Sequence, residues 1–212
     1  MKSRFWARIA SASIVLFLIL LAALHFLEPE YDPSRHLISE YELGRYGWMM
    51  SLDFFSLGVS VFAMVFSTWY SSTTRRGLVG RWCFLAISVA FFGAGVFRPH
   101  ITPNLASYLH GICGIIIILT FPIAASLYNS GLAHSQEWAG SRRLLSWMTW
   151  LVWVGLLSFV GSTIALGILA GPVNRSQATL LIGWQNRLMI LTYSLWPIIA
   201  AWPVVISKNR DL

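Results

Sequence analysis

Long apolar runs separated by short polar segments are the main pattern of this 212-residue chain. Membrane-spanning helices need about 17–25 predominantly apolar residues. Six stretches approach or exceed that length, the third being the shortest: residues 9–27, 48–70, 82–97, 108–128, 145–170 and 180–206. The pattern therefore predicts an all-α fold, a polytopic bundle of six transmembrane helices that forms a single domain over residues 1–212.

The first and last spans carry additional signals. Basic residues precede the first span, as in a signal peptide, but its nineteen nearly continuous apolar residues exceed the usual apolar core of such a peptide. We therefore expect a retained helix. The sixth span is long and contains Pro197 and Pro203, which predict a kink or a tilt.

Composition supports the membrane assignment and excludes a soluble globular protein. Hydrophobic residues make up 57% of the chain and charged residues only 11%, against roughly 25% charged in soluble domains. Trp and Tyr gather near the ends of the apolar runs, as in an aromatic belt at the headgroup layer. Cys83 and Cys113 are predicted near opposite membrane faces, too far apart for a disulfide.

The distribution of basic residues predicts the orientation. The net charge is +7, and ten of the fifteen Lys and Arg residues lie in the two termini and the even-numbered loops. Cytoplasmic loops attract such an excess, so both termini are expected in the cytoplasm of a multi-pass protein of the cell (inner) membrane. Orientation accounts for the basic residues, and nucleic acid is not an expected partner.

The polar segment 32–48, DPSRHLISEYELGRYGW, is then expected to face outward. Within it, Ser39 and Glu42 match the S-x-x-E capping box, so a helix is predicted to start near Glu40 and to continue into the second span. His36 and Glu40 are four residues apart and share a helix face if that helix begins earlier.

Asp53 is the most unusual single residue, because it lies inside the second span. Ser56, Ser60 and Ser67 follow it on the same helical face and form a polar stripe. Arg187 is predicted at a similar depth in the sixth span, so an ion pair with Asp53 is expected. This pair is either a structural clasp or part of a site in which Arg187 binds a phosphate or carboxylate.

The histidines gather on the predicted outer side, with only His134 on the other. His110 opens the fourth span there. None of the histidines has the i, i+4 spacing of a strong metal motif such as H-E-x-x-H. Neither a metal site nor a cofactor is expected.

Four blocks of sequence resemble a prokaryotic membrane family known as domain of unknown function 998. They are HLISEYELGRYGW after the first span, GAGVFRPH ending the third, YLHG opening the fourth and GWQNRLMILTYSLW in the sixth. The chain also resembles, more distantly, Frag1-type six-helix membrane proteins. The resemblance implies six helices whose polar motifs meet at one membrane face, and it implies no activity. The positions that carry the motifs here are His36, Ser39, Glu40, Asp53, His110, Gln185 and Arg187.

Three functions remain open. The first is an outward-facing site at headgroup depth that binds or modifies a lipid or isoprenoid-type substrate. In such a site Glu40 or His110 would act as acid or base, and the binding groups would be Arg187, Asp53, Gln185, His36 and Ser39. The second is a non-catalytic accessory subunit of a membrane assembly, with another membrane protein or a second copy as partner. The third is a small transporter that uses the Asp53 polar stripe.

Overall fold

The computed structural model describes residues 2–169 and 181–206, and every regular element in that part of the chain is helical. The six long helices have these bounds: α1 Lys2–Leu27, α2 Gly47–Ser67, α3 Arg75–Val96, α4 Leu105–Leu132, α5 Arg142–Leu169 and α7 Gly183–Ile206. Two short 3₁₀ helices, η1 (Ile38–Leu43) and η2 (Gln136–Trp138), lie in the connections. The predicted span ends at residues 170 and 180 lie outside the described residues.

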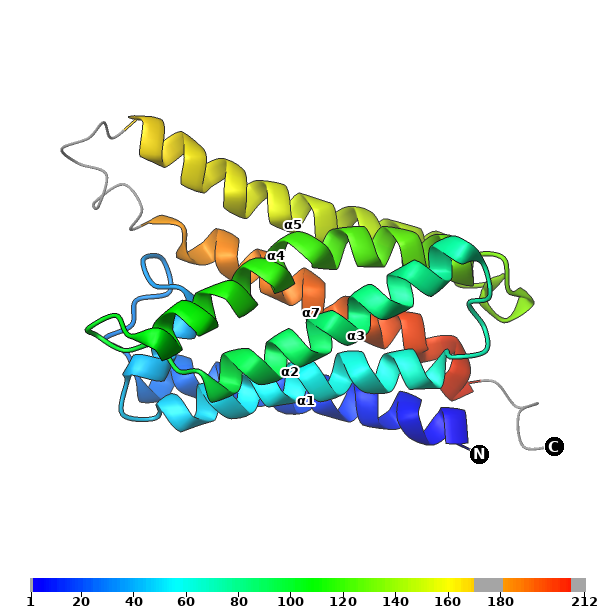
Figure 1. Cartoon of the computed structure of the whole chain (residues 1–212), viewed down its shortest axis with the longest axis horizontal. Coiled ribbons are helices and arrows are strands. Elements are labelled where there is room, and N and C mark those ends of the chain that lie inside the picture. The colour runs from blue at the N-terminus through cyan, green and yellow to red at the C-terminus, as the bar shows by residue number, and fades with distance from the viewer. Residues whose placement is uncertain (1, 170–180, 207–212) are drawn as a thin grey trace.

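All six long helices are long and apolar enough to cross a membrane, which confirms the predicted fold class. Consecutive helices are neighbours, and α7 also packs against α1, so the helices form a closed ring (Figure 1). α2 and α7 are the most buried, whereas α5 is the least. The start of α1 and the end of α7 lie together at one end of the bundle, called here the termini end.

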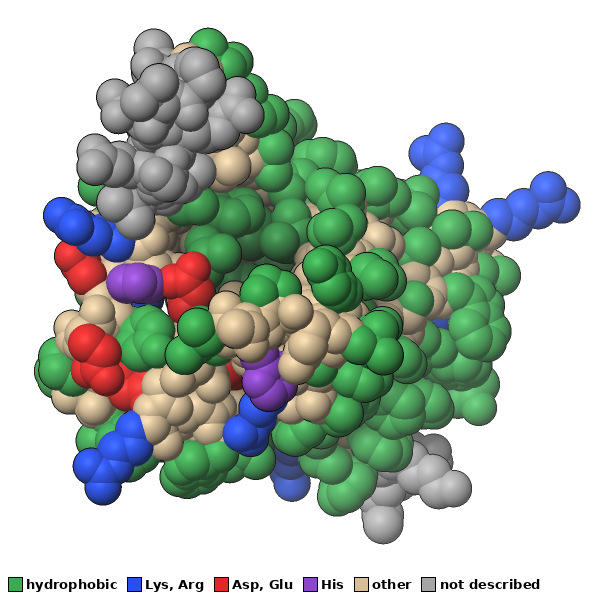
Figure 2. All heavy atoms as spheres, turned by 60° about the vertical axis from the view of Figure 1, so that its left-hand side comes forward, with side chains coloured by type: hydrophobic (Ala, Val, Ile, Leu, Met, Phe, Trp, Pro, Cys, Tyr) green, Lys and Arg blue, Asp and Glu red, His purple; other side chains and the backbone are tan. Residues whose placement is uncertain are grey.

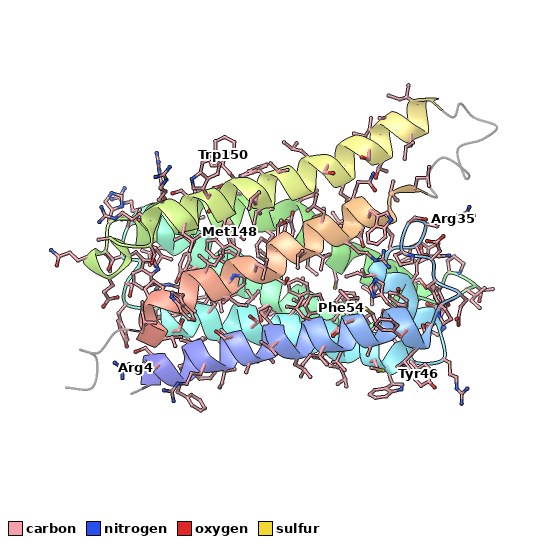
Figure 3. The ribbon with its side chains drawn as sticks, turned by 180° about the vertical axis from the view of Figure 1, so that it is seen from behind. Arg4, Arg35, Tyr46, Phe54, Met148 and Trp150 are labelled. Atoms are coloured by element: carbon pink, nitrogen blue, oxygen red, sulfur yellow. The ribbon has the colours of Figure 1, made fainter. Side chains whose placement is uncertain are left out.

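The opposite end, called here the loop end, carries the connection between α1 and α2. Arg35 and Tyr46 lie at this end and Arg4 at the other (Figure 3). In the same view Phe54 points into the bundle, while Met148 and Trp150 point to opposite sides of α5. Met148 is 7% exposed and Trp150 68% exposed, as expected for inner and lipid-facing positions of one helix.

A cluster of aromatic rings joins α3, α4 and α7 in the interior. Phe121 stacks on Tyr193 with centroids 4.3 Å apart, and Phe84 stacks on Trp196 at 5.0 Å. The polar atoms of these rings are satisfied within the bundle, since Tyr193 donates to the Ile118 carbonyl and Trp196 to Thr149 Oγ1. Lipid offers no such partners, so these bonds fix how the helices pack.

Neither proline of the sixth span ends the helix. α7 runs through Pro197 and Pro203 to Ile206, because the carbonyls freed by a proline can be satisfied by neighbouring helices. Trp138 of η2 also donates from Nε1 to the α7 carbonyl of Ala200, in the turn before Pro203, at 3.1 Å. Cys83 and Cys113 are free thiols.

Replacing Gly80 with leucine is expected to destabilise the bundle by about 1–3 kcal/mol, because backbone atoms of α4 leave no room for a side chain. A Cβ at this position would lie 2.7 Å from the backbone nitrogen of Tyr128 and 3.1 Å from the carbonyl oxygen of Ala124. Thermal unfolding in detergent measures the effect. Gly161→Leu is the control, since a Cβ there meets nothing within 4 Å; equal melting temperatures for the two variants would contradict the close packing.

Candidate functional site

The segment between α1 and α2, residues 28–46, covers the loop end and differs locally from the prediction. Residues 38–43 form η1, whose N-cap is Leu37 with no side-chain cap bond, and α2 starts only at Gly47. The predicted Ser39–Glu42 capping box and the helix start near Glu40 are therefore wrong. The physical reason is that Glu42 turns inward and accepts a hydrogen bond from Ser51 of α2, at 2.9 Å.

Arg187 ties this segment to the helices. Its NH1 nitrogen donates to the carbonyls of Pro33 and His36, at 3.0 and 2.7 Å, and also to that of Gly183. NH2 donates to the Tyr41 hydroxyl at 3.2 Å. With one side chain bonded to α7's own first turn and to three residues of the segment, the guanidinium serves as a structural anchor.

His25 of α1 accepts a further hydrogen bond from the Arg187 guanidinium. The arginine Nε donates to His25 Nε2 at 2.9 Å, so the proton of the neutral imidazole is placed on Nδ1. Nδ1 in turn donates to the Leu21 carbonyl at 2.7 Å. Next to Arg187, Asn186 Oδ1 accepts from the backbone nitrogen of Ile38. Two consecutive residues of α7 therefore fix the start of η1 and the loop before it.

Asp53 is not part of this network, so the predicted ion pair with Arg187 is wrong. Asp53 is completely buried, and neither carboxylate oxygen has a hydrogen-bond partner among the described residues. The donors of Arg187 bond to carbonyls of the loop end, to α1 and to Tyr41. Similar depth along two helices did not decide the pairing, because the long arginine side chain extends along the bundle toward the loop.

The polar stripe that follows Asp53 is used for packing. Ser60 donates to the Ala10 carbonyl of α1 at 3.0 Å, and Ser67 bonds to the carbonyl of Met64 in its own helix. Both hydroxyls are buried and satisfied inside the bundle.

A second buried group of polar side chains lies where α2, α3 and α4 meet the loop end. The Glu42 carboxylate is completely buried, and the Ser51 hydroxyl that donates to it accepts from Arg98 Nε at 2.8 Å. His110 Nδ1 lies 3.4 Å from Glu42 Oε2 and 3.1 Å from the carbonyls of Ala94 and Phe97. Burial raises the pKa of Glu42 to about 7, against the opposing effects of the Ser51 bond and the Arg98 charge.

His110 also lines a cavity of about 70 Å³ between α4 and α7. Ser39 and Asn186 contribute its other polar side chains, and the rest of the lining is apolar. The histidine ring packs edge-on against Phe54, another lining residue, with centroids 5.6 Å apart. The space-filling view shows acidic and histidine side chains gathered at this end, with a hollow in the hydrophobic surface beside them (Figure 2).

The remaining predicted residues lie outside this cavity. His36 Nδ1 is hydrogen-bonded to the Glu40 carboxyl on the segment, with side chains 35% and 37% exposed. Gln185 is partly buried, and its Oε1 has no partner among the described residues. The described residues include no group of three His, Cys, Asp or Glu side chains that could hold a metal ion.

The sequence patterns gave no indication of Glu28, Tyr41, Ser51 and Asn186, and they predicted a capping role for Glu42. Glu28 is buried where α1 ends and accepts from the backbone nitrogen of Tyr46. Its position directly after the first span was a usable signal, because an acidic residue there must find a donor or reach water. The partners of the others come from distant parts of the chain and leave no local pattern.

The fold and the polar loop end define the class of protein: a multi-pass, six-helix membrane protein. The chain belongs to the family described as "Protein of unknown function (DUF998)", whose model matches residues 11–203. No curated protein and no solved structure matches the chain.

Arg187 and Asp53 are expected to respond differently to neutralisation. Arg187→Gln leaves partly buried carbonyls of the segment without donors and should cost about 2–4 kcal/mol, lowering the melting temperature and exposing residues 33–36 to proteolysis. Asp53→Asn breaks no bond seen among the described residues and should leave the melting temperature unchanged or raise it. Equal losses of stability in both variants would indicate that Arg187 and Asp53 form an ion pair after all. Arg35→Gln is a neutral control, because its pair with Asp32 is exposed.

Stability is expected to fall as the pH rises from about 5 to 8. The folded protein keeps a proton on Glu42 up to a pKa of about 7, whereas the unfolded chain releases it near 4.5. The folded state therefore loses this advantage, at most about 3 kcal/mol, across that window. Melting temperatures measured against pH should be flatter for Glu42→Gln, while the exposed control Glu30→Gln should keep the wild-type slope. The same slope in Glu42→Gln would mean that another group titrates.

Proposed function

We propose that the loop end is a binding site for a lipid or isoprenoid-type molecule, with the polar headgroup at the segment 28–46 and the apolar chain between α4 and α7. We further propose that the protein lies in the cell (inner) membrane with both termini in the cytoplasm, so that this site faces outward. The excess of basic residues at the termini end supports that orientation, although Arg175, Lys208 and Arg210 lie outside the described residues.

The observation that carries the proposal is the composition of the cavity. Its walls are mainly aliphatic and aromatic side chains of α2, α3, α4 and α7, and its polar groups are Ser39, His110 and Asn186. Apolar walls with a few convergent polar groups are typical of small-molecule sites, and at about 70 Å³ this cavity would hold only part of such a molecule. The cavity lies between α4 and α7 on the loop-end side of the Phe121–Tyr193 stack, so an apolar chain in it would reach no deeper than these rings.

His110 is the residue suited to proton transfer at this site. Its Nδ1 proton is directed to backbone carbonyls, which leaves Nε2 as the basic nitrogen. The buried Glu42, 3.4 Å from the ring, would stabilise an imidazolium if His110 accepted a proton from a headgroup. We therefore assign the acid–base role to His110 with Glu42 as its positioning residue, and we place the His36–Glu40 pair at the polar rim.

The sequence suggested that Arg187 binds an anion. Here we propose that it anchors the segment 28–46 instead. Its bonds to the segment and to His25 already engage Nε and both terminal nitrogens. In this proposal Arg187 holds Ser39 and the start of η1 at the cavity, and it does not bind the headgroup.

Blocking the cavity should remove bound lipid without unfolding the protein. Gly114 lines the cavity, and a Cβ there meets nothing within 4 Å, so Gly114→Leu extends a side chain into the space. We expect its affinity for a polyisoprenyl phosphate or for phosphatidylethanolamine, measured separately by native mass spectrometry, to fall about tenfold or more.

The matched control is Gly111→Leu, one turn away on the same helix, exposed and equally free of neighbours. It should bind as the wild type does. Equal binding by Gly114→Leu and the wild type would contradict a site in this cavity. His110→Gln separates binding from chemistry: retained lipid with loss of any turnover would assign it the acid–base role.

A further inference from the structure

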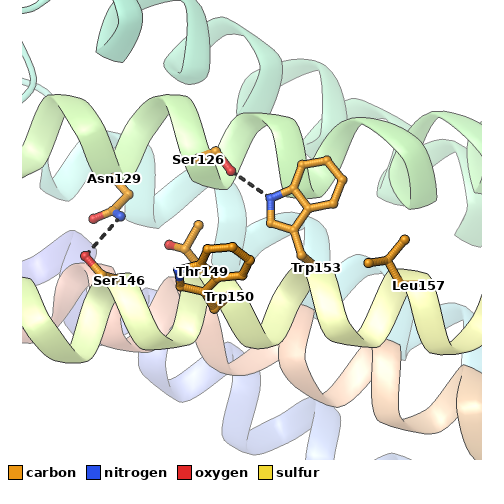
Figure 4. A pocket seen from close by; sticks show the side chains of 7 residues that line it. All are labelled: Ser126, Asn129, Ser146, Thr149, Trp150, Trp153 and Leu157. Carbon is orange, nitrogen blue, oxygen red and sulfur yellow. Dashed lines mark hydrogen bonds between the residues drawn. The ribbon is translucent and has the colours of Figure 1, made fainter.

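A larger groove lies between α4 and α5, nearer the termini end, and belongs to none of the features described above. Its volume is about 480 Å³, within the range of about 300–1,000 Å³ typical of ligand pockets. Figure 4 shows its floor, where Trp153 Nε1 donates to Ser126 Oγ at 2.9 Å and Asn129 Nδ2 donates to Ser146 Oγ at 3.4 Å. These two hydrogen bonds connect α4 to α5 along the groove.

The groove continues toward the termini end. A neighbouring hollow of about 350 Å³ shares Ser146 and Trp150 with it and adds Arg143 and Trp147. From Arg143 to Leu157, the deepest lining residue along α5, there are fourteen helical steps, or about 21 Å at 1.5 Å per residue. That length covers one leaflet of a hydrocarbon core about 30 Å thick.

The walls are mostly apolar along this whole length, but the polar side chains differ from one end to the other. Arg143 lies in the first turn of α5, Ser146 and Asn129 come about one turn deeper, and the far end is formed by Leu157 and by Trp153, whose Nε1 is already bonded to Ser126. A cation at the interface, hydroxyl and amide groups below it and an apolar slot beyond match the order of phosphate, glycerol and acyl chain in a phospholipid. A partner helix would not require its polar contacts only at one end.

Two further observations concern the headgroup. Asn129 Oδ1 is buried and has no hydrogen-bond partner among the described residues, so an acceptor is left for a ligand hydroxyl. Arg75, Arg76, Arg142 and Arg143 start α3 and α5 at the termini end, and such basic groups attract anionic lipids. The charge selects an anionic headgroup and the amide selects one that carries a hydroxyl.

We propose that the groove between α4 and α5 binds one anionic, hydroxyl-bearing phospholipid of the leaflet at the termini end. Its phosphate lies at Arg143, a headgroup hydroxyl donates to Asn129, and one acyl chain follows Trp150 and Trp153 to Leu157. This site is separate from the loop-end cavity and does not depend on the function proposed for that cavity.

The test compares phosphatidylglycerol with phosphatidylcholine of identical chains, titrated into the full-length protein and followed by native mass spectrometry. Phosphatidylglycerol should bind more tightly. Arg143→Gln should weaken it about fivefold, whereas Arg142→Gln, the same charge change one residue away and outside the lining, should weaken it less than twofold. Equal effects of the two substitutions would mean general surface attraction and would overturn the site.

Ser146→Phe supplies the steric test, because Ser146 is exposed and lies where the two hollows join. Both lipids should be lost from this variant while its melting temperature stays near that of the wild type. Unchanged lipid binding, or a wild-type dimer that Ser146→Phe dissociates in the absence of lipid, would overturn the proposal. Gly114→Leu should keep phosphatidylglycerol at this groove, so failure of the loop-end site is distinguishable from failure of this one.

Discussion

The interaction on which the loop end depends is the set of hydrogen bonds made by the Arg187 guanidinium. A buried arginine is costly unless its donors are satisfied, and a polar loop at the membrane boundary is costly unless its carbonyls are. Here the arginine donors and the loop carbonyls satisfy each other, since Arg187 donates to the carbonyls of Pro33 and His36. His25 and Tyr41 add α1 and η1 to the same centre.

This anchoring determines where the chemically interesting groups lie. With residues 33–38 fixed on α7, η1 places Ser39 at the cavity and directs Glu42 into the bundle toward Ser51 and His110. The Glu42 side chain is thereby held in a dry position, and this burial raises its pKa to about 7. Arg187, which anchors the segment, and the Glu42–His110 contact are therefore separate groups of the loop end.

The two ends of the bundle differ in how they use charge. At the loop end, Arg187 and Glu42 lie in buried hydrogen-bond networks, whereas the Asp32–Arg35 and His36–Glu40 pairs are exposed or partly exposed. At the termini end, basic residues start α3 and α5 at exposed positions, and the groove beside them is open to the bilayer. Asp53 fits neither pattern, because its carboxylate is buried without a partner among the described residues.

The sequence by itself determined the number and approximate bounds of the helices and the free state of the two cysteines. These follow from hydropathy over some twenty residues and from rise per residue, which are local properties. His36 and Glu40 do contact each other, but not on a shared helix face, because η1 begins only at Ile38. Only the tertiary structure decided that Arg187 bonds to loop carbonyls and leaves Asp53 alone, that Glu42 turns to Ser51 and does not cap a helix, and that Ser39, His110 and Asn186 share one cavity. Those choices depend on side-chain direction and on contacts between residues as many as 162 positions apart, and a pattern along the chain does not record which distant donor bonds to which acceptor.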